Sequence, residues 1–277
     1  MLKICKLSSL LYNLVMKKGL ILTIVLLVGV IAYMYFHKRG DVAEVPLDTD
    51  TDLVLEPEDT GTITKLLFNG EVKKEINEEN EFLIVKVAYP AFEDENVSKE
   101  VLNAVEGELT QFKKDINFDN FPAEERDRIK EFGYKYTFDS AYELKEGKGL
   151  HSIILDFSTY TGGAHGNHYI KSFNYNDAGQ RITIGDVFSP ETNYLTKLSE
   201  LSRVKIKEKL EDGVGSWADE GTAPTTDNFS TFYTDMEGVL HIVFQPYQVA
   251  PWSAGVVEIS IDMKSELGDI IDTKYLN

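Results

Sequence analysis

A loop rich in glycine and histidine carries the clearest chemical signal in the sequence. His165 and His168 stand three residues apart in the run Thr161-Gly162-Gly163-Ala164-His165-Gly166-Asn167-His168. Such a pair could ligate zinc, with His151 and Asp156 on the preceding expected strand as further donors. The alternative is a hairpin loop in which glycines supply unusual backbone angles and histidines hydrogen-bond locally. This alternative is favoured, because the helix that fixes a histidine pair in zinc motifs is not expected here.

A second candidate segment, residues 245–255, is stiffened by two prolines and carries two large aromatic residues. Tyr247 and Trp252, together with Trp217, could stack on sugar rings or anchor a protein partner. Alternatively, these rings plug one end of the core. Ser253 does not fit a nucleophile elbow, which requires glycine where Pro251 stands. We therefore assign no catalytic residue, metal ligand or cofactor, and the candidate binding residues are Gly162, Gly163, His165, Asn167, His168, Tyr247 and Trp252.

Apolar periodicity predicts the elements that must position these loops. An apolar stripe at three- and four-residue spacing predicts a helix over residues 96–116. Proline and glycine signals predict further helices from Pro122 to before Gly133, from Ser189 to about Leu210, and over 263–271. The expected strands are 82–89, 134–138, 150–160, 169–175, 181–184, 229–234, 239–245 and 256–261. Separate runs of strands and helices indicate an α+β fold of antiparallel sheets with packed helices.

Charge divides the chain into two unlike parts. Of the 28 basic and 46 acidic residues, residues 1–40 hold six basic and no acidic ones. Residues 41–277 therefore hold 22 basic and 46 acidic residues, a net charge of −24. This acidity argues against a nucleic-acid binder, which needs a basic face to neutralise phosphates. It favours a cationic partner.

An uncharged run from Gly19 to Phe36 predicts a single transmembrane helix, assigned to residues 19–37. Four basic residues precede the run, and the acidic linker 41–61 follows with eight acidic residues and no basic one. The positive-inside rule then places the short segment 1–18 in the cytoplasm and the large C-terminal part outside the cell membrane. A cleaved signal peptide is the alternative, but it needs small residues after the apolar core, where this sequence has bulky ones.

Several segments resemble the bacterial domain of unknown function 3298. They are Tyr160–Asn167, Phe173–Tyr175 with Gly179, Ile182–Phe188 and the late segment Phe244–Gly255. Ala88-Tyr89-Pro90 and the helix after it resemble the companion domain that precedes this family in envelope proteins of the RsiV and PdaC types. The resemblance implies a companion α/β subdomain over residues 62–133. It also implies a C-terminal α+β domain over residues 134–272 that holds the glycine-histidine loop.

In that family the pair of domains resembles an extracytoplasmic binding unit more than an enzyme. We therefore expect a membrane-anchored binding module of the cell envelope whose partner is a cationic protein such as lysozyme, or peptidoglycan. An anti-sigma role is not expected, since at most 18 residues precede the apolar run. The alternative function is an envelope hydrolase, or a metal-dependent enzyme, that uses the His165 and His168 loop.

Overall fold

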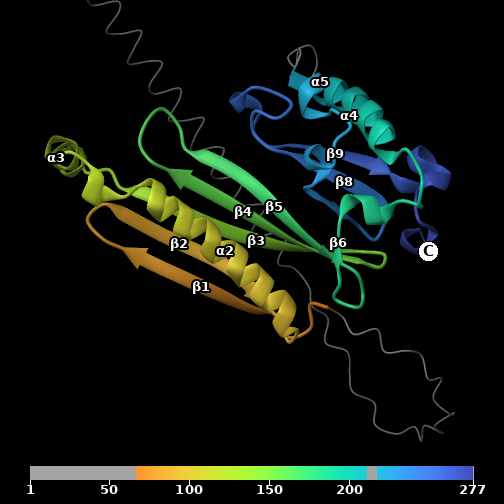
Figure 1. Ribbon diagram of the computed structural model, residues 1–277, viewed down its shortest axis with the longest axis horizontal. Helices are drawn as coiled ribbons and strands as arrows, with labels where there is room; N and C mark the ends of the chain where they lie inside the picture. The colour runs from red at the N-terminus through yellow and green to blue at the C-terminus, as the bar shows by residue number, and fades with distance from the viewer. Residues whose placement is uncertain (1–66, 211–216, 277) are drawn as a thin grey trace, which may run out of the picture. The chain divides into compact units, whose positions relative to one another are not determined.

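Two β-sheets with packed helices make up the fold in the computed structural model, which describes residues 67–210 and 217–276 (Figure 1). The predicted α+β class is confirmed, but the larger sheet is mixed and not antiparallel as predicted, whereas the smaller sheet is antiparallel. The strands are β1 Val72–Glu79, β2 Leu83–Ala91, β3 Tyr136–Gly147, β4 Leu150–Tyr160, β5 Asn167–Tyr175, β6 Arg181–Ile182, β7 Phe232–Thr234, β8 Val239–Phe244 and β9 Val257–Asp262. The α-helices are α2 Glu95–Asp115, α3 Ala123–Phe132, α4 Tyr194–Leu210 and α5 Trp217–Gly221.

The larger sheet has six strands in the order β1-β2-β3-β4-β5-β6. Strands β3 to β6 form the predicted antiparallel meander, and β1 pairs antiparallel with β2. Strands β2 and β3 are parallel, with Leu83 opposite Tyr136. A parallel pair needs a long crossover, and α2 and α3 provide it. This sheet contains strands from both sides of residue 133, the predicted boundary between subdomains.

Helix α2 covers one face of the larger sheet, as its apolar stripe predicts (Figure 1). The Asp94 side chain caps its N-terminus by accepting hydrogen bonds from the N–H groups of Asn96 and Val97, at 2.9 and 3.2 Å. The buried stripe comprises Val97, Val101, Val105, Leu109 and Phe112. Phe112 contacts Phe138 of β3 with ring centroids 5.2 Å apart. Helix α2 is part of the crossover between β2 and β3, and it packs against both of these parallel strands.

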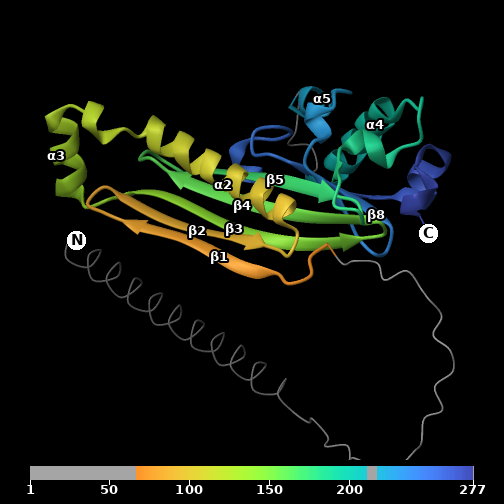
Figure 2. The ribbon, with the colours of Figure 1, turned by 60° about the horizontal axis from the view of Figure 1, so that its bottom comes forward.

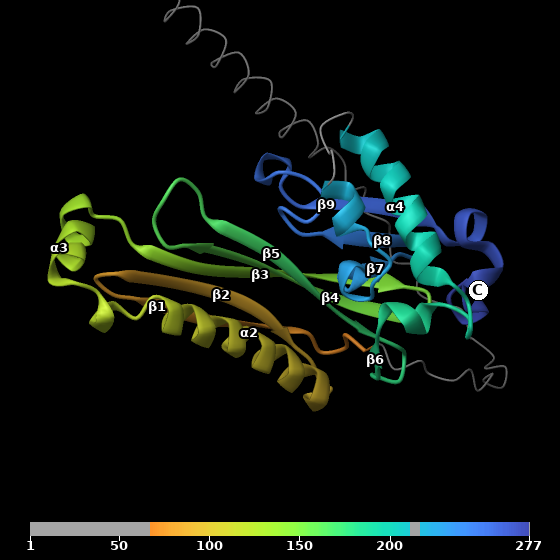
Figure 3. The same ribbon diagram turned by 45° about the horizontal axis from the view of Figure 1, so that its top comes forward.

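The small sheet, in the order β7-β8-β9, packs on the opposite face from α2. Ile153 and Leu155 of β4 lie in the core beneath α2, whereas Ile154 contacts Tyr233 and Val243 of the small sheet. Both faces of β4 are consequently buried. The small sheet and α4 lie toward one end of the long strands and α3 lies at the other (Figures 2 and 3). The two ends of the large sheet are thus covered by different elements.

Two predicted helices differ from the structure for local reasons. Helix α4 begins at Tyr194 and not at Ser189. Ser189 is held outside the helix because its N–H donates to the Ile270 carbonyl at 2.8 Å and its hydroxyl donates to the Ile271 carbonyl. The expected final helix is a π-helical turn, Met263–Leu267, followed by a 3₁₀ turn. Gly268, at φ 50°, ends the first turn.

Two elements were not predicted. Strand β1 lies at the sheet edge with most residues exposed, so it lacks the buried apolar run that marks β2. Helix α5 lies where a loop was expected. Both elements contribute to the sites described below.

None of the helices in the described part of the chain combines the length and apolar character that a bilayer crossing requires. The predicted membrane helix 19–37, the segment 1–18 and the linker 41–61 lie outside the described residues. These assignments stay predictions.

Candidate functional site

The two loops singled out from the sequence meet in space. The glycine-histidine loop joins β4 to β5, and the loop 245–256 joins β8 to β9. The His165 ring stacks on the indole of Trp252, with centroids 4.4 Å apart and an interplanar angle of 17°. Trp252 contacts Tyr247 at 5.8 Å, and Tyr247 stacks on Trp217 of α5 at 5.9 Å. We call these four side chains, His165, Trp252, Tyr247 and Trp217, the aromatic row.

The aromatic row is open to solvent. Tyr247 is 48% exposed and Trp217 is 40% exposed, which is unusual for rings of this size. His165 is also exposed. Tyr247 and Trp217 therefore do not plug the end of the core, whereas Trp252 is half-buried. Exposed aromatic side chains held against one another are preorganised for contact with a flat apolar surface.

The backbone at the centre of the row is strained. Tyr247 has φ 69°, in the left-handed region that non-glycine residues rarely adopt and that costs of the order of 1–3 kcal/mol. The Gln248 side chain holds this turn by donating to the carbonyls of Gly221 and Asn228, at 3.0 and 3.1 Å. It also accepts a hydrogen bond from the Gln245 N–H at 2.9 Å. This network presents the Tyr247 ring at the surface.

Close packing at Gly221 sets the position of Trp217. A Cβ atom at Gly221 would overlap the carbonyl oxygen of Gln248 and lie 2.6 Å from its carbonyl carbon. Only glycine allows helix α5 to approach the loop this closely. Gly221 is the last residue of α5 and Trp217 is the first, so the same approach brings Trp217 against Tyr247.

Gln245 ties the loop to the larger sheet. Its Oε1 accepts a hydrogen bond from the Ile170 N–H, and its Nε2 donates to the Ile170 carbonyl, both at 2.8 Å. Nε2 also donates to the Thr231 hydroxyl at 3.3 Å. Gln245 thus pairs with β5 as a neighbouring strand would. Because β5 begins just after His165, this contact fixes the distance between His165 and Trp252.

The glycines shape the other side of the row. Gly162 and Gly163 have φ values of 86° and 100°, conformations that favour glycine. A Cβ atom at Gly166 would lie 2.5 Å from the Thr159 carbonyl oxygen. The His165 Nδ1 lies 2.8 Å from the Gly166 carbonyl oxygen, to which it can donate. The loop therefore turns tightly and holds the imidazole over Trp252.

The other predicted residues do not join the row. Asn167 pairs with Thr159 at the start of β5. The His168 Nε2 lies 2.8 Å from Asp156 Oδ1, so this pair hydrogen-bonds within the sheet. His151 lies at the opposite end of β4 from the loop, about 30 Å away for a strand of this length. The zinc donors considered as an alternative in the sequence therefore do not converge, and no group of three potential metal ligands occurs among residues 67–210 and 217–276.

His151 instead forms a separate buried cluster. One ring nitrogen hydrogen-bonds with the Glu146 carboxylate, and the other lies 2.8 Å from Asp177 Oδ1. Burial alone lowers the pKa of His151, but the hydrogen bonds to these carboxylates outweigh it and raise the pKa above its usual value. This histidine is a structural hub that contacts Phe68 at 5.7 Å.

Sequence reasoning missed the two glutamines that organise the row. Gln245 and Gln248 flank Pro246-Tyr247, and neither residue type marks a turn or a binding site. The only signal in the sequence was the pair of glutamines that flanks a proline and an aromatic residue. Their roles depend on Ile170 and Gly221, which are distant in the sequence.

Comparison with family models matches two segments of the chain. Residues 185–264 match the family described as "Protein of unknown function (DUF3298)", and residues 76–168 match the family "Deacetylase PdaC". The resemblance found in the sequence is therefore confirmed. The glycine-histidine loop falls in the PdaC-type segment, so it is not within the DUF3298 match. The aromatic row thus joins His165 from one segment to three rings from the other.

Individual proteins with similar sequence or fold are also known. The chain is 30% identical over 211 residues to the peptidoglycan-N-acetylmuramic acid deacetylase PdaC of Bacillus subtilis, covering 76% of this chain and 43% of that protein. The chain therefore spans less than half the length of this relative. A DUF3298 protein of Bacteroides fragilis has a similar fold, with a TM-score of 0.57 and 21% identity over 74% of this chain and 94% of that structure. One from Pseudomonas aeruginosa gives a TM-score of 0.47 at 15% identity, over 76% of this chain and 98% of that structure.

Proposed function

We propose that this chain, in which a PdaC-type segment is followed by a DUF3298-type segment, is a cell-envelope protein that binds the glycan of peptidoglycan through the aromatic row. The observation that carries the proposal is the stack of four rings, in which His165, Tyr247 and Trp217 are exposed and Trp252 is half-buried. The apolar face of a pyranose ring packs on aromatic rings, and the polar edges of a sugar remain in water. The relative's name refers to peptidoglycan, which supports this choice of ligand.

The row has features of a binding surface that needs little reorganisation. Tyr247 is held in a strained conformation by the Gln248 side chain, so its ring orientation is set before a ligand arrives. Trp252 lies between His165 and Tyr247 and contacts both. Removing the central ring should therefore remove the largest share of the affinity.

Binding of the full chain to purified, insoluble peptidoglycan tests this function. In sedimentation assays at physiological salt, Trp252→Ala and Tyr247→Ala should each weaken binding by about tenfold or more, since central aromatic anchors contribute ~2 kcal/mol or more. Phe132→Ala is the matched control, because Phe132 is an exposed ring on α3, outside the row. If all three variants bound peptidoglycan equally well, the role of the aromatic row would be refuted.

A cationic protein such as lysozyme is the second candidate partner. The supporting observation is the net charge of −24 over residues 41–277, which attracts basic proteins over long distances. Calorimetry with lysozyme at two salt concentrations separates a specific site from general attraction. One-to-one binding that persists at physiological salt and is weakened by Trp252→Ala supports this partner. Binding that disappears there, where the screening length is about 8 Å, contradicts it.

We also propose that residues 19–37 anchor the chain in the cell membrane with the folded part outside. The support is the charge asymmetry on the two sides of the apolar run. We expect activity from a reporter that is fused after Asn277 and that works only outside the cytoplasm. Activity of a cytoplasm-dependent reporter at the same position would contradict both the anchor and the envelope location.

A further inference from the structure

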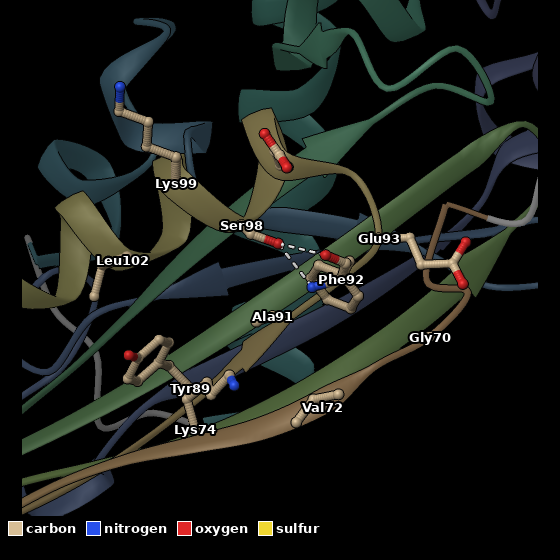
Figure 4. A pocket seen from close by; sticks show the side chains of 11 residues that line it. Gly70, Val72, Lys74, Tyr89, Ala91, Phe92, Glu93, Ser98, Lys99 and Leu102 are labelled. Atoms are coloured by element: carbon tan, nitrogen blue, oxygen red, sulfur yellow. Dashed lines mark hydrogen bonds between the residues drawn. The ribbon is translucent and has the colours of Figure 1, made fainter.

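A cleft of about 500 Å³ lies between β1, β2 and α2, away from the aromatic row (Figure 4). Its floor consists of two cross-strand pairs, Val72 opposite Ala91 and Lys74 opposite Tyr89. One wall is α2, which contributes Leu102. The cleft exists because α2 packs over β2 and leaves the inner face of the edge strand β1 uncovered (Figure 1). A cleft of this size with a largely apolar lining is typical of small-ligand sites.

One end of the cleft is formed by the turn between β2 and α2. The Ser98 hydroxyl donates to the Phe92 carbonyl at 3.0 Å and accepts from the Phe92 N–H at 2.7 Å, which fixes the turn between β2 and α2. The Glu93 side chain lies over Gly70, where an added Cβ atom would come within 2.7 Å of Glu93 Cγ. The shape of this end therefore exists without a ligand.

Charges of opposite sign line the two ends of the cleft. Glu93 lies beside Gly70 at one end, and Lys74 and Lys99 lie toward the other (Figure 4). Glu95, in the first turn of α2, also lines the cleft, one helical turn before Lys99. None of these four side chains forms an ion pair with another described residue. The cleft is therefore apolar in its middle, negative at one end and positive at the other.

We propose that this cleft binds a short peptide with a free amino group at the Glu93 end and a carboxylate at the Lys74 end. The charges of such a peptide complement both ends, and small apolar side chains fit the floor of Val72, Ala91 and Tyr89. From Val72 to Lys74 strand β1 spans about 7 Å, and the turn that leads back to Gly70 extends the cleft further, which suits an extended peptide of about three residues. This inference concerns a site separate from the aromatic row.

Calorimetry with trialanine and its blocked forms tests the proposal on the full chain in lipid nanodiscs. Trialanine should bind saturably, with a dissociation constant of about 1 mM or tighter. Amidation of its carboxyl end or acetylation of its amino end should each weaken binding about two- to fivefold, because each removes a charge pair. Equal affinity of free and blocked peptides, or no saturable binding of trialanine, would overturn the proposal.

Protein variants assign each end of the peptide. Lys74→Gln with Lys99→Gln should abolish the discrimination against the amidated peptide while leaving the discrimination against the acetylated one. Glu93→Gln should do the reverse. Lys114→Gln, near the other end of α2, is the matched control and should change neither. Discrimination that survives both pairs of substitutions would also overturn the proposal.

A second measurement separates this site from the proposed glycan site. Ala91→Trp fills the cleft floor and should abolish trialanine binding without changing sedimentation with peptidoglycan. Trp252→Ala should have the opposite effects. If Trp252→Ala abolished trialanine binding, the peptide would bind at the aromatic row and the assignment to the cleft would be wrong.

Discussion

Replacing Gln245 tests how the two halves of the aromatic row are held together. The side chain satisfies both the N–H and the carbonyl of Ile170, at 2.8 Å each, and donates to Thr231 at 3.3 Å. Gln245→Ala removes all three hydrogen bonds and leaves the Ile170 groups on the outer edge of β5 without their partner. The loop that carries Trp252 would then lose its connection to the strand that follows His165.

The expected loss of unfolding free energy follows from the number and burial of these hydrogen bonds. A net contribution of about 0.5–1.5 kcal/mol for each bond gives an upper range of several kcal/mol. The site is only partly buried, so water can replace some of the lost partners. We therefore expect Gln245→Ala to lower the free energy of unfolding by about 2 kcal/mol. For a folded part of this size, the melting temperature should fall by about 4–8 °C.

Denaturant and thermal unfolding, followed by circular dichroism, measure this loss. Gln111→Ala is the matched control, because Gln111 is exposed on α2 and forms a single side-chain bond with Asp115. That control should change stability by less than about 0.5 kcal/mol. Tryptophan fluorescence should change only in Gln245→Ala, as His165 moves away from Trp252. Equal stability of the two variants would refute the view that Gln245 joins β5 to the loop.

Further expectations concern backbone fit and pH. Gly221→Ala should destabilise the fold by about 3 kcal/mol in denaturant unfolding, because the added Cβ would overlap backbone atoms of Gln248. Gly107→Ala is the control: Gly107 lies in open space on α2, so this change should stabilise the fold by about 0.5–1 kcal/mol. Gly163→Val should lower the melting temperature through its φ of 100°, and an unchanged melt would mean that the loop relaxes freely. Burial by itself lowers the pKa of His151, but its hydrogen bonds to two carboxylates have the larger combined effect and raise the pKa above the usual 6.5. Its stabilisation is complete below pH 6.5 and is lost as the pH rises through the raised pKa. His151→Gln should therefore remove the loss of unfolding free energy that accompanies a rise in pH above about 6.5.

The sequence was sufficient for elements with a strong apolar pattern. The stripe from Val97 to Phe112 predicts α2, and Gly133, in a left-handed conformation, ends α3 as expected. Strand β1 escaped prediction because Val72–Glu79 is mostly charged and exposed, which is typical of an edge strand protected from further pairing. Local pattern identifies an element only where that element buries a regular face.

The two loops of the candidate site were both identified from composition, but their contact was not. The stacking of His165 on Trp252 depends on the packing of the small sheet against β5, through Gln245 and Ile170. No local rule relates residues so far apart in the chain. The same limit explains why His151 was grouped with His165 as a possible donor, although the length of β4 separates them.

The parallel pairing of β2 with β3 has a consequence for the order of folding. The β3–β4 and β4–β5 hairpins join neighbouring segments and can form within microseconds, whereas a long segment with two α-helices separates Leu83 from Tyr136. Closing that long loop costs chain entropy before the contacts are gained. The rate-limiting step should therefore be the docking of the β1–β2 hairpin and α2 onto a preformed meander. Chaperones and proteases would then encounter an intermediate whose exposed edge is β3.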